Sequence, residues 1–85
     1  MYKEQVKVAN IFKNYSNPIA QIVQNACMYE SELHAKTENR RANLKSIMGI
    51  MAFDWSEGMD VEIEAEGTDA QEAVEAIRKF LLCQS

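Results

Sequence analysis

Apolar and polar residues alternate along several stretches of the chain, and a period of two is typical of strands with one buried face. The clearest case is residues 59–65, where apolar side chains alternate with acidic ones. Weaker alternation at residues 2–8 and 33–37 predicts two further strands. Residues 38–40 suit a hairpin turn leading into a short fourth strand over residues 41–44.

Apolar residues three and four positions apart predict three helices. Asn17 suits the N-cap of the first helix and Pro18 its first position. Ser46 suits the N-cap of a short apolar helix over residues 47–53. A capping box precedes the last helix, formed by Thr68 with Gln71 or by Asp69 with Glu72. The predicted buried stripes are Ile19, Ile22, Val23, Ala26 and Cys27 in the first helix, and Ala70, Ala73, Val74, Ile77, Phe80 and Leu81 in the last.

A polar stretch at residues 13–18 separates the first strand from the first helix. The predicted order is therefore β-α-β-β-α-β-α. Four strands that each need one covered face, with three helices to cover it, predict a two-layer sandwich of the α+β class. Its four-stranded sheet is expected to be mostly antiparallel and to leave its other face in contact with solvent.

The composition is that of one small globular domain over residues 1–85, with 47% hydrophobic and 26% charged residues. No apolar run approaches the roughly 20 residues that span a bilayer, and the N-terminus lacks a signal-peptide core. We therefore expect a cytoplasmic protein with no membrane partner. Cys27 and Cys83, with His34 as the only histidine, exclude a disulfide framework and a self-contained zinc site, and Cys27 is expected to be buried.

The charge is unevenly distributed. Residues 1–45 carry seven basic and four acidic side chains, whereas residues 46–85 carry two basic and nine acidic ones. No basic stripe is available to replace phosphate counterions, so direct binding of nucleic acid is disfavoured. The asymmetry fits two solvated faces of one domain, or a basic half on which an acidic partner docks.

No constellation of residues predicts catalysis, a metal site or a bound cofactor. His34 falls on the solvated face of its strand without a nearby nucleophile. The acidic residues between positions 60 and 66 share one exposed strand face, whereas a calcium site needs a turning loop. The sequence also lacks a glycine-rich phosphate loop, and we therefore expect a protein that is not an enzyme.

Two segments are candidate sites. The helix start at Ser16, Asn17 and Pro18 offers free N–H groups and a helix dipole to an anion. At Ser46 a hydroxyl lies beside a helix too apolar for its length, so one or two of its methionines should stay exposed. The residues alone fit a docking patch next to a phosphorylatable serine, or a core helix with a plain cap.

Residues 43–51, with Ser46 at their centre, resemble the regulatory serine segment of HPr, the phosphocarrier of the bacterial sugar phosphotransferase system. The last strand and helix, from Gly58 through Val61, Gly67 and Asp69, resemble the same family, as does the first helix from Pro18. The resemblance extends over the whole chain without an apparent gap. It implies the open-faced β-sandwich of the HPr family, with the element order predicted above.

The chain departs from this family at the phosphoacceptor. The family's histidine position, three residues before the proline of the first helix, is Tyr15, and its arginine position is Asn17. A phenol with a pKa of about 10 is a weak nucleophile at neutral pH, and its phosphate ester is a poor phosphoryl donor. Loss of the arginine also removes a bidentate partner for the phosphoryl group. We therefore predict that the protein is not a phosphocarrier.

Ser46 is retained, and in the HPr family this serine is phosphorylated by HPr kinase/phosphorylase. The resemblance then implies a regulatory protein that acts with a LacI-type catabolite regulator. A second hypothesis is an unswitched module that docks on Enzyme I or a sugar permease domain, and a third is a different pathway built around Tyr15. The partner-binding residues implied by the resemblance are Ser16, Ala20, Gln21, Ile47, Met48 and Met51.

Overall fold

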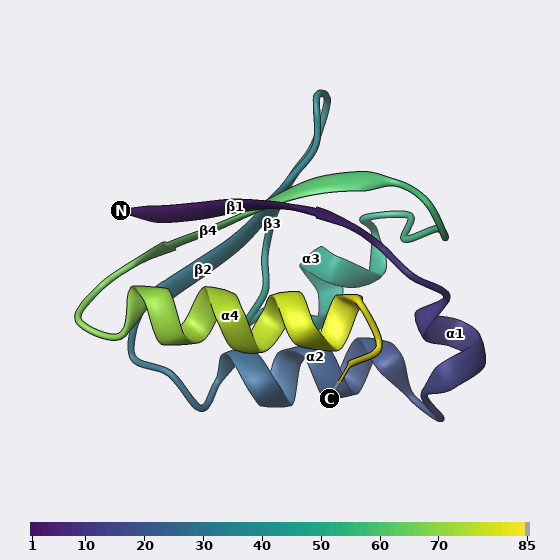
Figure 1. The fold of residues 1–85 in the computed structure, drawn as a ribbon, viewed down its shortest axis with the longest axis horizontal. Coiled ribbons are helices and arrows are strands. Elements are labelled where there is room, and N and C mark those ends of the chain that lie inside the picture. Colours follow the sequence, from purple (N-terminus) through teal and green to yellow (C-terminus); the bar gives the residue numbers. More distant parts are fainter. Residues whose placement is uncertain (85) are drawn as a thin grey trace.

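The structure is a computed structural model that describes residues 1–84 (Figure 1). Its elements follow the predicted order, with one additional short helix. They are β1 (Tyr2–Lys7), α1 (Ile11–Asn14), α2 (Pro18–Ala26), β2 (Glu32–Lys36), β3 (Arg41–Asn43), α3 (Ile47–Met51), β4 (Asp60–Glu66) and α4 (Ala70–Leu81).

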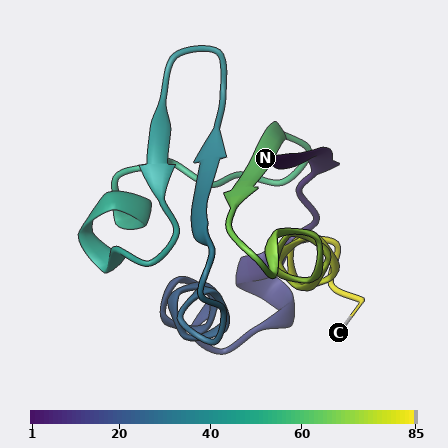
Figure 2. The same cartoon turned by 90° about the vertical axis from the view of Figure 1, so that its left-hand side faces the viewer.

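The four strands form one sheet in the order β1-β4-β2-β3, and every described pair is antiparallel. Helices α2 and α4 lie side by side beneath this sheet, and α3 lies next to β3 (Figure 2). The turn between β2 and β3 projects from the molecule, closed by the Thr37 N–H donating to the Arg40 carbonyl at 2.8 Å. The predicted α+β class and the sheet with one uncovered face are confirmed.

The hydrophobic core fills the space between the sheet and the helices. Strand β4 contributes its alternating apolar residues, and α4 contributes the stripe predicted for it, with only Ala70 left partly exposed. This is the outcome expected when the hydrophobic face of a sheet packs against amphipathic helices. The fully buried large side chains are Ile11, Ile22, Leu33, Leu44, Ile50, Ile63, Ile77, Leu81, Val8, Val61 and Val74.

Helix α1 overlaps the beginning of the predicted polar stretch at residues 13–18, and the sequence predicted no helix there. It is one turn long, and the Asn10 side chain caps it by accepting from the Lys13 N–H at 3.0 Å. Ile11 anchors it in the core. Four residues are too few to display helical periodicity, so the hydrophobic pattern could not reveal this turn.

The predicted burial of Cys27 is wrong. Helix α2 ends at Ala26, and Cys27 occupies the C-cap with its side chain exposed. The 3.6-residue pattern was extended one position too far, because the end of a helix is set by its cap as well as by its apolar stripe.

Glu64 also differs from its predicted place on a solvated face, since only 6% of its surface is exposed. Strand β4 lies in the interior of the sheet, so Glu64 has Lys3 opposite it on one side and His34 on the other. Its carboxylate pairs with Lys3 at 3.9 Å and with Arg41 at 3.4 Å. Neighbouring long side chains therefore cover it, and His34 itself is half-buried.

The predicted capping box before α4 is wrong in either form. Asp69 is the N-cap residue, but neither its side chain nor another caps the helix. Its carboxylate instead accepts from the N–H groups of Glu30 and Ser31, each at 2.9 Å, and from the Ser31 hydroxyl. Asp69 thus joins the start of α4 to the segment before β2, an interaction between residues 38 positions apart.

These contacts predict a dependence of stability on pH. Hydrogen bonds from the Ser31 hydroxyl and the Glu30 N–H lower the pKa of Asp69. A carboxyl group whose pKa is lower in the folded state stabilises the fold above its unfolded pKa, and this contribution is lost as pH falls below about 4. Urea unfolding at pH 6 and pH 3 measures this dependence. Between the two pH values, the free energy of unfolding should fall less for Asp69→Asn than for the unsubstituted protein. Equal losses would contradict the assignment.

Candidate functional site

Tyr15 follows α1 in an extended conformation, and its side chain turns toward the end of α4. Its ring stacks on that of Phe80, with centroids 4.0 Å apart and planes 9° apart. Its hydroxyl donates to the Phe80 carbonyl at 2.8 Å. The phenol is half-buried and its proton is engaged by the backbone, which further reduces its suitability as a nucleophile.

Removing this hydroxyl should cost the fold about 1 kcal/mol, the net value of a typical hydrogen bond. The Phe80 carbonyl also accepts from the Cys83 N–H at 3.0 Å, so it keeps a hydrogen-bond donor in Tyr15→Phe. Tyr15→Leu also removes the ring stacking, worth about another 0.5–1.5 kcal/mol. Urea unfolding of both variants measures these steps, and a Tyr15→Leu variant no less stable than Tyr15→Phe would show that the stacking contributes nothing.

Asn17 caps α2 as predicted. Its side chain accepts from the Ala20 N–H at 3.5 Å, and its own N–H donates to the Gln21 side chain at 3.3 Å. One N–H group of the first turn is therefore already paired, which leaves fewer for an anion. Ser16 is exposed beside this helix start, and Ala20 and Gln21 are half-buried.

Ser46 caps α3, as the sequence predicted. Its backbone is extended, its hydroxyl oxygen accepts from the Gly49 N–H at 3.2 Å, and its carbonyl accepts from Ile50 at 3.1 Å. The side chain is half-buried, because α3 packs on β3 and α2. The serine hydroxyl thus lies at the N–H end of a short helix whose other end carries no basic residue.

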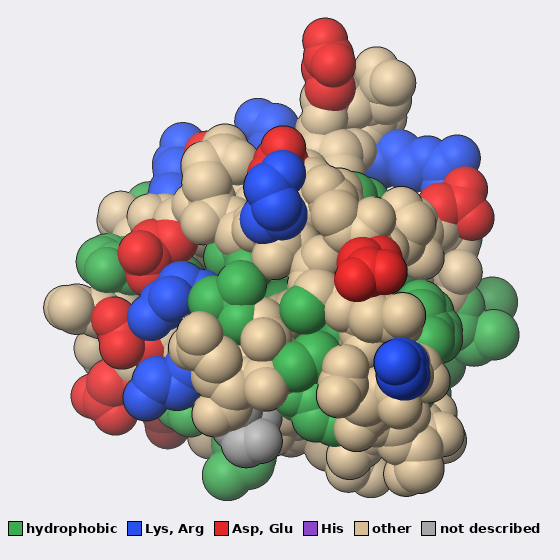
Figure 3. Space-filling model, turned by 45° about the vertical axis from the view of Figure 1, so that its right-hand side comes forward, with side chains coloured by type: hydrophobic (Ala, Val, Ile, Leu, Met, Phe, Trp, Pro, Cys, Tyr) green, Lys and Arg blue, Asp and Glu red, His purple; other side chains and the backbone are tan. Residues whose placement is uncertain are grey.

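Helix α3 directs its apolar residues to two sides. Ile50 is fully buried, whereas Ile47, Met48 and Met51 expose 47%, 80% and 66% of their surface. The prediction that methionines of this helix stay exposed is confirmed, and these three residues are called here the α3 patch. Figure 3 shows apolar side chains reaching the surface in several places on one face of the molecule, between polar and charged ones.

The structure brings most of the predicted partner-binding residues onto neighbouring elements. Ala20 and Gln21 lie in α2, Ser16 directly precedes it, and α2 contacts α3, which carries the α3 patch. Phe12 in α1 was not predicted, although 54% of its surface is exposed. The available signal was an aromatic residue directly before the polar stretch at residues 13–18.

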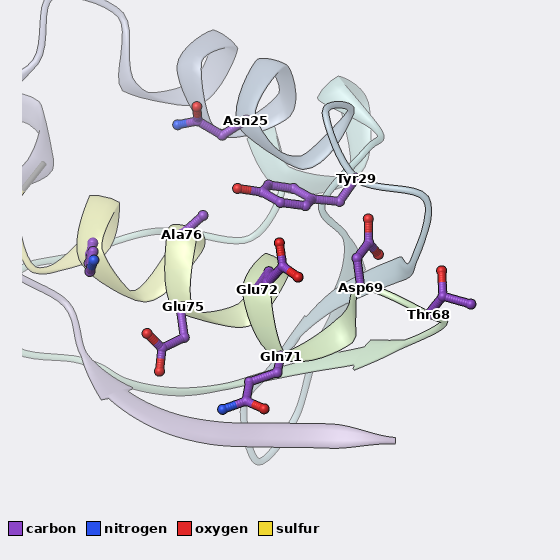
Figure 4. Close-up of a pocket in the computed structure, with 9 residues that line it drawn as sticks. Asn25, Tyr29, Thr68, Asp69, Gln71, Glu72, Glu75 and Ala76 are labelled. Atoms are coloured by element: carbon purple, nitrogen blue, oxygen red, sulfur yellow. The ribbon is translucent and has the colours of Figure 1, made fainter.

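A further groove of about 690 Å³ lies apart from these predicted residues. It runs between the end of α2 and α4 and is lined by Asn25, Tyr29, Thr68, Asp69, Gln71, Glu72, Glu75, Ala76 and Lys79 (Figure 4). Within residues 1–84, no three side chains are grouped so as to hold a metal ion. No helix in the same range is long and apolar enough to cross a membrane.

A small antiparallel sheet backed by helices on one face, with a capped serine beside an exposed apolar patch, has the architecture of an open-faced β-sandwich. The family model described as the PTS HPr component phosphorylation site matches residues 2–82. The chain belongs to the HPr family.

Individual relatives agree with this assignment. The chain is 35% identical to the HPr-like protein Crh of Halalkalibacterium halodurans over 95% of its length and 96% of the relative. It is 32% identical to the phosphocarrier protein HPr of Lysinibacillus sphaericus over 95% of its length and 92% of the relative. These relatives are a phosphocarrier HPr of the phosphotransferase system and an HPr-like Crh, and Crh of Bacillus subtilis is described as the catabolite repression HPr.

Solved structures show the same fold. The HPr-C-His structure from Thermoanaerobacter tengcongensis superposes with a TM-score of 0.86 at 33% identity, covering 95% of this chain and 91% of the other. The crystal structure of Crh from Bacillus subtilis, described as a swapped dimer, superposes with a TM-score of 0.76 at 30% identity. That match covers 93% of this chain and 86% of the other.

Proposed function

We propose that this protein is a regulatory member of the HPr family that does not carry phosphate, and that phosphorylation of Ser46 by HPr kinase switches it. It acts by docking on other proteins in carbon catabolite control, in the cytoplasm and without contacting nucleic acid itself. A LacI-type catabolite regulator or a protein of the phosphotransferase system is its partner. The observation that carries the proposal is the Ser46 hydroxyl at the start of α3, next to the α3 patch.

The chemistry of phosphoserine supports a switch at this position. A phosphate on Ser46 adds about −1.5 to −2 charges at neutral pH and three acceptor oxygens. The N–H of Gly49, which now donates to the hydroxyl oxygen, is within reach of such oxygens. The same charge beside Ile47, Met48 and Met51 favours a basic partner and disfavours a purely apolar one.

The environment of Tyr15 supports the absence of phosphocarriage. Its hydroxyl is bonded to the Phe80 carbonyl and its ring is stacked, so phosphorylation would require both contacts to break. Asn17, at the family's arginine position, brings no positive charge to neutralise a phosphoryl group. We therefore expect no label on Tyr15 after incubation with phosphoenolpyruvate and Enzyme I.

Intact-mass spectrometry after incubation with HPr kinase and ATP tests the switch. We expect one phosphate on the unsubstituted protein and none on Ser46→Ala. An unmodified protein would contradict the proposal, as would a phosphate that persists on Ser46→Ala. A phosphoprotein that binds no transcription regulator would contradict the regulatory part.

The exposure of the α3 patch also favours a second candidate, an unswitched docking module or decoy for Enzyme I or a sugar permease domain. Its contact surface would comprise the same α3 patch together with Ser16, Ala20 and Gln21. This candidate requires binding by the unphosphorylated protein, whereas the switched regulator requires Ser46 phosphorylation. Binding assays with both forms therefore distinguish the two.

A further inference from the structure

Lys45, directly before Ser46, links the start of α3 to the far end of α2. Its ammonium donates to the Tyr29 carbonyl at 2.7 Å in a partly buried position. Tyr29 lies in the turn that follows α2, and α2 has no basic residue in its own last turn. Lys45 therefore places a positive charge from another element in the turn that follows α2.

The Tyr29 ring packs against the core, whereas the backbone of the turn held by Lys45 is only weakly restrained. Cys27 and Met28 are exposed, and the N–H groups of Met28 and Tyr29 make long backbone hydrogen bonds of 3.2 and 3.3 Å. The next residues are held more firmly, because Glu30 and Ser31 donate to the Asp69 carboxylate at 2.9 Å. The contact from Lys45 thus restrains a short segment that ends at this carboxylate.

Tyr29 also forms part of the groove beside α4. Its ring is half-buried and lies between the turn and α4, with Glu72 and Ala76 nearby on the helix (Figure 4). Any loosening of the Tyr29 backbone changes the wall of this groove. The groove and Ser46 are therefore connected through one lysine side chain.

We propose that Lys45 couples the phosphorylation state of Ser46 to the turn at Tyr29 and to the groove beside α4. The inference rests on the proposed modification of Ser46. A phosphate on the adjacent residue competes with the Tyr29 carbonyl for the Lys45 ammonium. Within residues 1–84 Lys45 makes no ion pair, so no carboxylate competes with the phosphate for its ammonium.

The phosphate is a stronger acceptor for the Lys45 ammonium than the Tyr29 carbonyl, because it carries a full negative charge. The Lys45 ammonium is charged in either bond, but a phosphate adds the attraction between two full charges, whereas the carbonyl offers only a dipole. The four-carbon stem of Lys45 is flexible and allows its ammonium to reorient without movement of the backbone. Phosphorylation then transfers the ammonium to Ser46 and releases the turn over residues 27–29.

Hydrogen exchange followed by NMR tests this coupling, using protein with phosphoserine incorporated at position 46 during translation. We expect the Met28 and Tyr29 amides to exchange about three to ten times faster than in the unmodified protein, as for loss of one hydrogen bond in a local opening. The Ser31 amide, bonded to Asp69, should keep its rate and serves as the internal reference for intact folding.

Lysine substitutions test whether Lys45 is the residue responsible for this change in exchange rate. Unphosphorylated Lys45→Met should already show the fast exchange at Met28 and Tyr29, and phosphoserine should add nothing to it. Lys45→Arg keeps the charge and should keep the response. Lys36→Met, which removes an exposed lysine from β2, is the matched control and should respond like the unsubstituted protein.

An unchanged response in Lys45→Met would overturn the inference, as would normal exchange in the unphosphorylated variant. Because the phosphoserine is installed without HPr kinase, the result does not depend on whether that enzyme recognises this protein. Failure of the proposed function would instead appear as an unmodified Ser46 in the kinase assay. The two outcomes are therefore separable.

Discussion

Replacing Gly67 by alanine should lower the free energy of unfolding by about 3 kcal/mol, from backbone strain and overpacking together. Gly67 ends β4 with a φ of +151°, a conformation that residues with a side chain rarely adopt. A Cβ atom there would lie 2.5 Å from the Ser31 Oγ and 2.7 Å from the Ser31 Cα. Ser31 is fully buried and bonded to Asp69, so it has no free space to move into.

Urea unfolding measures this loss, and Gly58→Ala is the matched control. Gly58 also has a positive φ, +86°, but a Cβ atom there would meet nothing within 4 Å. We expect Gly58→Ala to lose only the backbone contribution of about 1 kcal/mol. Equal losses at the two positions would show that the close approach to Ser31 has no energetic consequence.

Met48→Asp should weaken docking on HPr kinase by about 100-fold without destabilising the fold. Met48 exposes 80% of its surface, so the folded protein alone gives up little packing. In a complex that buries the α3 patch, the new carboxylate would lose its hydration and find no hydrogen-bond or ion-pair partner, which costs several kcal/mol. Titration calorimetry with the kinase measures the change in affinity.

Met28→Asp provides the comparison for this experiment. Met28 is exposed to a similar extent, 76%, but lies in the turn after α2 rather than on α3. The two variants have the same change in composition and net charge, so they differ only in the position of the new carboxylate. Equal weakening by both would argue against a contact centred on the α3 patch, and urea unfolding of each variant verifies that the fold is intact.

Tyr15 and Ser46 lie in different surroundings. Tyr15 is joined to α4 through Phe80, whereas Ser46 is capped on a short helix with an exposed apolar side. Tyr15, which the resemblance places at the family's phosphoacceptor position, is part of the packing of this chain. Ser46 has a neighbouring N–H donor and an exposed apolar surface on which the proposed modification would act.

Local patterns determined most of the fold. The alternation at residues 59–65, the Asn17-Pro18 helix start and the Ser46 cap all specify structure through the nearest few residues. Such features can be predicted from the sequence because side-chain direction follows a fixed period and caps act within one turn. The exposed side of α3 was also predictable, because a short helix cannot turn four apolar residues into one small core.

The tertiary structure alone decided where residues distant in sequence meet. Asp69 was expected to cap its own helix but binds Ser31, Glu64 was expected in solvent but is enclosed by Lys3 and Arg41, and Tyr15 proved to be fixed on Phe80. None of these pairings leaves a periodic signal in the chain, because each depends on how the sheet and helices assemble. Local sequence therefore determined the elements and the serine cap, and three-dimensional packing decided which polar groups are partners.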